Sequence, residues 1–286
     1  MSRQGRFVRV SRRLTLAASA FMLVQCDRDP TEPPVVAPET VPTVNIPVSP
    51  LAPPPALSRA EMIAALAQAA SVYAAGSTMT GTDPLVGRSF SLKLPFGCGG
   101  PASNDQSSEG LAQWQWGEGQ TSIRLSMTPV DWITSPLVAG AVVVEEGDSP
   151  ENPWEAVEGF WIERPWLAIE TCPATSLSAS ISAPATPQTT GLVAVFPENG
   201  SRLNRRNGRA YQHTIRAEGD TPLTPPAGGF TLRLEGRVVS FPNGRAARCV
   251  AYSPDQRPTC VAAVQLDRVA FEEAATGSTL AEWRVG

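Results

Sequence analysis

The first regular pattern in the chain is a helical one that begins at Ser58. The segment SRAEMIAALAQAASVYAAG opens with Ser58 and Glu61 at the spacing of a capping box and closes at Gly76. Its apolar side chains recur every three or four residues, at Met62, Leu66, Ala69 and Tyr73. We therefore expect a helix over residues 58–75 that packs its apolar side on the rest of the domain.

After Gly87 the pattern changes to the alternation of apolar and polar residues that is typical of β strands. Clusters of Gly, Pro, Asn or Asp separate the predicted strands, which cover 88–96, 121–127, 191–196, 211–217, 230–241, 261–271 and 279–285. Residues 230–285 predict an antiparallel meander. The pairs Asn207-Gly208 and Asn243-Gly244 predict type I′ hairpin turns, because both central residues of that turn need positive φ. We expect a mainly β fold, an antiparallel sandwich or open barrel with one N-terminal helix.

The first 25 residues have the charge order of a secretory signal peptide. Five arginines and no acids precede residues 14–25, a stretch of 12 mostly apolar residues, whereas a bilayer-spanning helix needs about 20. The segment LVQC, residues 23–26, resembles the lipobox of bacterial lipoproteins, and this resemblance implies that Cys26 becomes the lipidated first residue of the mature chain. The segment SRRLTL, residues 11–16, is similar to a twin-arginine export signal, so two export routes stay open.

The next segment, residues 27–57, contains ten prolines among 31 residues. Proline lacks the amide proton and fixes φ, so such a chain favours extended polyproline II. It predicts a tether between a membrane anchor and a folded domain, with a plain disordered linker as the alternative. The expected organisation is a signal peptide over 1–25, lipidated Cys26 and a proline-rich tether over 26–57, and a β-rich domain over 58–286.

If Cys26 is lipidated, an even set of four cysteines remains for an oxidising compartment: Cys98, Cys172, Cys249 and Cys260. Four cysteines allow three pairings. The turn-rich segment VAYSPDQRPT favours a bridge between Cys249 and Cys260, which leaves Cys98 with Cys172. The chain has no C-x-x-C motif and His213 is its only histidine, so we expect no metal and no cofactor.

Charge argues against a nucleic-acid partner. Without the five signal arginines, 18 basic residues face 27 acidic ones, which gives a net charge near −9, whereas nucleic-acid binders must neutralise phosphates. Within this acidic domain, Arg205, Arg206 and Arg209 flank one predicted turn. They form a candidate site for lipid headgroups or an acidic partner, or an ordinary solvated hairpin tip.

Tryptophans are the other candidate ligand-binding residues. Trp114 and Trp116 share one face if they lie in a strand, and Trp161 lies in a second aromatic-rich segment. Flat indole rings can stack on sugars, although tryptophans of β domains more often pack on the core. The nearby acids Glu158 and Glu163 fall on opposite faces of a strand. Because no serine lies in a G-x-S-x-G motif either, we assign no catalytic residue.

Two functions fit these residues. The first is an exported envelope protein, lipid-anchored on the periplasmic side of a bacterial membrane, whose non-catalytic β domain is structural or binds a glycan, an envelope component or a protein partner. The second is a periplasmic glycan-acting hydrolase with an acid pair assembled from loops. Two acids about 5 to 10 Å apart beside Trp161 or Trp116 would favour the hydrolase, and a flat aromatic or arginine surface without paired acids would favour the binding protein.

Overall fold

The computed structural model describes residues 53–78, 80–103, 109–139, 153–174, 187–197, 205–217, 219 and 222–285. Cys26, the signal segment and most of the predicted tether lie outside this part of the chain. The described residues belong to one compact unit, Ala52–Gly286. Leu57, which the proline pattern assigns to the tether, is buried in the core, and its backbone pairs with that of residues 89 and 91.

Helix α1, Arg59–Ala74, confirms the predicted N-terminal helix. Ser58 caps it, and Glu61 completes the capping box. Met62 and Leu66 are buried against the core, as their spacing predicts. The first helical residue, Arg59, is also buried, which the pattern does not predict.

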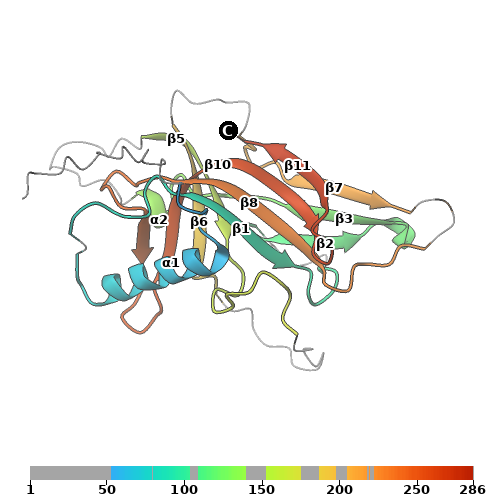
Figure 1. Cartoon of the computed structure of the whole chain (residues 1–286), viewed down its shortest axis with the longest axis horizontal. Helices are drawn as coiled ribbons and strands as arrows, with labels where there is room; N and C mark the ends of the chain where they lie inside the picture. The colour runs from blue at the N-terminus through green and yellow to red at the C-terminus, as the bar shows by residue number, and fades with distance from the viewer. Residues whose placement is uncertain are drawn as a thin grey trace, which may run out of the picture. The chain divides into compact units, whose positions relative to one another are not determined.

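The described strands form two sheets, in agreement with the predicted mainly β sandwich (Figure 1). The larger sheet runs in the order β1 (Ser89–Phe96), β8 (Phe230–Val238), β10 (Thr259–Glu273), β6 (Thr190–Pro197), β5 (Trp154–Trp161) and β4 (Val130–Asp131), with β9 (Ala247–Val250) and β11 (Thr279–Arg284) also paired to β10. The smaller sheet consists of β2 (Ala112–Trp116), β3 (Ser122–Met127) and β7 (Tyr211–Arg216). Two short helical segments, η1 (Glu118–Gln120) and α2 (Pro136–Ala139), lie in connections.

Strand β10 is the centre of the large sheet because both of its edges are paired. Val264 pairs with Val238 of β8 and with Ala194 of β6, so these two strands lie on opposite edges. The pairing of β10 with β8, β9 and β11 is antiparallel, as expected for residues 230–285. The pairing with β6 is parallel, and the sequence pattern did not predict it.

A register shift between Leu266 and Arg268 divides β10 in two. Before it, even-numbered residues face the main core, and after it, odd-numbered residues do so; these are Cys260, Ala262, Val264, Leu266, Val269 and Phe271. An extra residue in one strand reverses the alternation of its side chains. One long strand therefore keeps the same core on the same side along its whole length.

Both faces of the large sheet are covered. On one face, the main core packs against α1 through Met62 and Leu66 and against the small sheet through Trp114 and Leu125; Figure 1 shows these two elements at different ends of the large sheet. On the other face, a second apolar cluster around Trp132 and α2 packs on β5, β6 and β10.

The two Asn-Gly pairs differ from each other. Asn207 and Gly208 both have positive φ, but the following strand β7 pairs with β3, so the turn connects no hairpin among the described strands. At Asn243-Gly244 only the glycine has positive φ, and the predicted type I′ turn is wrong. Pro242 fixes φ near −65° at the position before Asn243, which suits a type I turn followed by a left-handed glycine.

Candidate functional site

A cavity of about 710 Å³ with aromatic and polar walls lies on the second face of the large sheet. This volume is in the usual range of small-molecule sites, about 300 to 1,000 Å³. Its aromatic walls are Trp132, Trp161, Trp166 and Tyr252. Its polar walls are Ser135, Gln188, Thr189, Gln256, Arg257 and Thr259. We call it the aromatic pocket.

Trp132 and Trp161 form one wall of the pocket, with ring centroids 4.6 Å apart and nearly perpendicular planes. The Trp132 ring lies directly on two glycines of the sheet. A Cβ added to Gly159 would come within 2.4 Å of this ring, and one added to Gly191 within 3.2 Å. The missing side chains leave a shelf on β5 and β6, so the indole can lie against the backbone.

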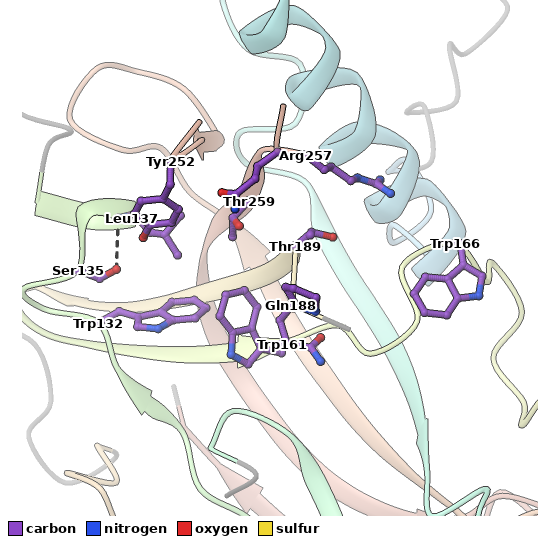
Figure 2. A pocket seen from close by; sticks show the side chains of 12 residues that line it. Trp132, Ser135, Leu137, Trp161, Trp166, Gln188, Thr189, Tyr252, Arg257 and Thr259 are labelled. Carbon is purple, nitrogen blue, oxygen red and sulfur yellow. Dashed lines mark hydrogen bonds between the residues drawn. The ribbon is translucent and has the colours of Figure 1, made fainter. Parts of the chain in front are cut away.

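In Figure 2, Tyr252 lies above Trp132, and Trp166 lies farther away, beyond Trp161. Tyr252 is 73% exposed and Trp166 is 66% exposed, which makes them the two most exposed large apolar residues of the described chain. Their ring faces contribute little to the core, but they border a cavity. Exposed aromatic rings that converge on a pocket are typical of binding sites.

The loop that carries Trp166 is held by Arg59, which is only 1% exposed. The Arg59 guanidinium donates hydrogen bonds to the backbone carbonyls of Glu163 (2.6 Å), Arg164 (3.2 Å) and Leu167 (3.1 Å). Burial, with the neighbouring Arg164 charge, lowers the pKa of Arg59 to about 10, which still leaves it charged at neutral pH. The start of α1 and the Trp166 loop are thus one hydrogen-bonded unit.

The same loop is tied to the end of β1. The Arg164 guanidinium pairs with the Glu163 carboxylate at 2.9 Å and donates to the carbonyl of Pro95 at 2.8 Å. The disulfide Cys98–Cys172, one of the two bridges that the sequence favours, closes the loop on its far side. Burial raises the pKa of Glu163, although the arginine charges oppose this effect. Its carboxylate is therefore part of the scaffold of the loop.

The opposite side of the pocket comes from the loop between β9 and β10, which carries Tyr252 and Arg257. The second disulfide, Cys249–Cys260, joins directly opposed residues at the base of this loop, with 4.1 Å between their Cα atoms. The hydroxyl of Tyr73 at the end of α1 accepts the backbone N–H of Ala251. The loop therefore leaves the sheet from a fixed base.

The predicted tryptophans separate into two groups. Trp114 is 3% exposed and belongs to the core, where it packs edge-on against Phe230 and against Trp116, which is half-buried beside it. Trp114 cannot stack on a ligand in this conformation. Trp161 is half-buried and lines the aromatic pocket.

The arginines around Asn207 are largely used by the fold. Arg205 forms a 2.8 Å ion pair with Glu155, and the Arg206 guanidinium lies 4.7 Å from the centre of the Tyr211 ring. Arg209 is exposed and donates to the carbonyl of Arg206. The group thus orders its own turn, and of the three predicted residues only Arg209 extends into solvent.

Glu158 anchors the same turn from β5. One of its carboxylate oxygens accepts the backbone N–H groups of Arg206 (2.7 Å) and Asn207 (3.1 Å). Burial raises its pKa and these two N–H groups oppose the rise. Glu158 faces the main core side with Phe160, whereas Trp161 faces the pocket side, as the strand parity predicts. Glu158 is therefore not positioned to act on a ligand in the pocket.

His213 and metal chemistry offer no second site in the described part of the chain. His213 is half-buried on β7, and desolvation lowers its pKa. No hydroxyl or carboxylate of a described residue hydrogen-bonds to its ring. Within the described ranges, no cluster of three or more His, Cys, Asp or Glu side chains could hold a metal ion.

Sequence reasoning did not identify Trp132, Tyr252, Gln188 or Arg257 as site residues. Their side chains come from three separate connections, since Tyr252 and Arg257 share the loop between β9 and β10, and only the folded sheet brings them together. One signal was present in the sequence: a turn-rich loop closed at its base by two cysteines is a common way to present side chains.

None of the described helices is long and apolar enough to cross a membrane. Family models, curated proteins and solved structures were all compared with this chain, and none matches it.

Replacing Gly159 with alanine tests the shelf under Trp132. The new Cβ would overlap the indole, so we expect the free energy of unfolding to fall by about 1 to 3 kcal/mol. Urea unfolding followed by tryptophan fluorescence measures this change. Gly99→Ala is the control, because its added Cβ meets nothing within 4 Å and its effect should stay within about 0.5 kcal/mol. Equal stabilities of the two variants would contradict the close packing.

Arg59→Gln tests the anchor of the Trp166 loop. An amide cannot replace a guanidinium that serves three carbonyls, so we expect a loss of about 2 to 4 kcal/mol in stability. Amide hydrogen exchange should also accelerate over residues 163–170. Arg216→Gln, an exposed change on β7, is the control and should leave both measurements unchanged. Unchanged exchange over 163–170 in Arg59→Gln would show that the loop is held by other contacts.

Proposed function

We propose that this chain is an exported, lipid-anchored envelope protein whose β domain binds an envelope component in the aromatic pocket without transforming it. The observation that carries the proposal is the composition of the pocket. Four aromatic rings converge there with neutral hydroxyl and amide groups, and the described lining residues include neither a carboxylate nor a histidine. Such a surface can hold a ligand, but it offers no general acid, base or nucleophile pair.

The carboxylates near the tryptophans have structural partners, which also supports binding over hydrolysis. Glu163 pairs with Arg164, and Glu158 holds the backbone of the turn after residue 205. A glycosidase needs two carboxylates that flank one bond. Two acids that stabilise separate loops do not meet that requirement.

The exported location is supported by the two disulfides of the domain, because such bonds form and persist in oxidising compartments. The lipid anchor rests on the signal segment and on the resemblance of residues 23–26 to a lipobox. The proline-rich segment after Cys26 suits a spacer that holds the domain away from the membrane surface. We place this domain on the periplasmic side of a bacterial membrane.

Cys26→Ser tests the anchor. Serine cannot form the thioether to the lipid, so incorporation of a labelled fatty acid into the protein should fall to background, and the protein should leave the membrane fraction. Gel detection of the label after immunoprecipitation measures this. Ser19→Ala, in the signal segment, is the matched control and should retain the label. Label that persists in Cys26→Ser would refute lipidation at this residue.

Trp166→Ala tests the pocket. Trp166 is 66% exposed, so its removal should leave the fold intact while it takes away one wall of the site. We expect cosedimentation of the full-length protein with purified envelope fractions to fall at least about fivefold, as for an aromatic contact residue. Arg216→Ala, exposed and outside the pocket lining, is the control.

Two outcomes would contradict the proposed function. If Trp166→Ala and Arg216→Ala sediment as the wild type does, the aromatic pocket is not the binding surface. If the wild-type protein releases soluble sugar from the envelope material during the incubation, the β domain is catalytic.

A further inference from the structure

The aromatic pocket carries a single positive charge in an otherwise acidic chain. Arg257 is the only charged side chain among the described residues that line the pocket. It is exposed, and no carboxylate of the described chain lies within ion-pair distance of it, including Asp255 in the same loop. Since the predicted mature chain has a net charge near −9, this local excess of positive charge differs from the rest of the molecule.

Five other arginines of the described chain have a carboxylate partner. Arg164, Arg205, Arg233, Arg268 and Arg284 each form at least one ion pair. These five are used to fix loops and strands. Arg257 belongs to a loop with a fixed base, and it forms no ion pair within the described chain. Its guanidinium is therefore available to a ligand in the pocket.

We propose that the ligand of the aromatic pocket is a glycan that carries carboxylate groups. This inference rests on the binding function proposed above and adds the chemical class of the ligand. The apolar faces of the sugar rings lie against the indole and phenol rings, and a carboxylate of the glycan pairs with Arg257. A planar guanidinium binds a carboxylate through two parallel hydrogen bonds, which also fixes the orientation of the sugar.

The shape and chemistry of the walls fit a sugar chain. Figure 2 shows Trp132 and Trp161 adjacent, with Tyr252 facing Trp132 from above and Trp166 farther along, beyond Trp161. Rings that are spread along a cavity in this way can contact successive sugars. An apolar ligand would need no polar wall, but here neutral hydrogen-bonding groups stand beside the rings: Gln188, Thr189, Gln256 and Thr259. Their hydroxyl and amide groups can donate to and accept from sugar hydroxyls.

The described pocket lining contains no acidic side chain, which also favours an anionic ligand. Sites for neutral sugars often use carboxylates as acceptors for hydroxyl groups, but a carboxylate in the wall would repel an acidic ligand. The described lining has neutral acceptors only, together with Arg257. The electrostatic pattern is therefore complementary to an anion that also has hydroxyl groups and apolar faces.

Binding measured on matched ligand pairs tests this inference. The probes are tetrasaccharides of galacturonate, glucuronate and mannuronate, each paired with its carboxyl-reduced, neutral counterpart, and the protein is the full-length chain in detergent. We expect at least one acidic member to bind, and its carboxyl-reduced partner to bind about tenfold more weakly. Rising salt, from about 0.02 to about 0.5 M, should weaken only the acidic form, because screening acts on charges.

Arg257→Gln and a matched control assign the effect to one residue. Arg257→Gln should weaken binding of the acidic ligand about tenfold and leave binding of the neutral ligand unchanged. The substitution in the protein and the removal of the carboxylate from the ligand should therefore have non-additive effects on binding, as expected for groups in direct contact. Arg237→Gln removes the same charge from an exposed position on β8 outside the pocket lining, and it should have no effect. Trp161→Ala should weaken both ligands.

Three results would overturn the inference. Equal binding of the acidic and neutral members would show a glycan site without charge selection. Equal weakening by Arg257→Gln and Arg237→Gln would show an effect of overall charge. If no acidic glycan binds, the ligand is of another class, such as an apolar peptide. In each case, the loss of envelope binding in Trp166→Ala still decides the proposed function by itself.

Discussion

The buried guanidinium of Arg59 is the interaction on which the described site depends. Burial of a charge is expensive, and it is tolerated only where hydrogen bonds replace the lost water. Here three backbone carbonyls of one loop accept hydrogen bonds from Nε and Nη2 of Arg59, whereas its Nη1 is buried without a partner among the described residues. Because the guanidinium gives these carbonyls donors and the carbonyls give the guanidinium acceptors, the helix start and the Trp166 loop stabilise each other. An exposed aromatic residue thereby gains a fixed position from a contact that lies out of reach of any ligand.

A second constraint explains why a pocket forms at this place on the sheet. Strand β10 keeps the main core on one face throughout its length, which frees the opposite face of β5 and β6 for a smaller apolar cluster. Gly159 and Gly191 have no side chains, so that face is flat at these positions. The Trp132 indole therefore lies against the backbone and does not insert between side chains of the sheet. The apolar cluster ends at Trp161, which is also a wall of the aromatic pocket.

Local pattern predicted the elements of this protein well, because capping, period and turn residues act over a few positions. The capping box at Ser58, the strands β8, β10 and β11 and the Cys249–Cys260 disulfide follow from such signals, whereas β9 is not among the predicted strands. The parallel partner of β10 and the burial of Arg59 depend on segments far apart in the chain, so no local pattern could contain them. The same holds for tryptophans: Trp114 and Trp161 look alike in sequence, and only the packing of the two sheets makes one a core residue and the other a wall.

The exposure of Trp166 and Tyr252 is the feature that folding alone does not explain. An aromatic ring in water contributes little to stability, since the hydrophobic effect rewards only area that is removed from water. Nevertheless, the loops that carry these two rings are secured by a buried arginine, by a disulfide each and by hydrogen bonds to α1. A flexible loop would lose conformational entropy whenever its rings closed on a ligand, and that loss would weaken binding. Rings that are fixed in advance avoid this loss, which is the physical advantage of a rigid scaffold around an open aromatic pocket.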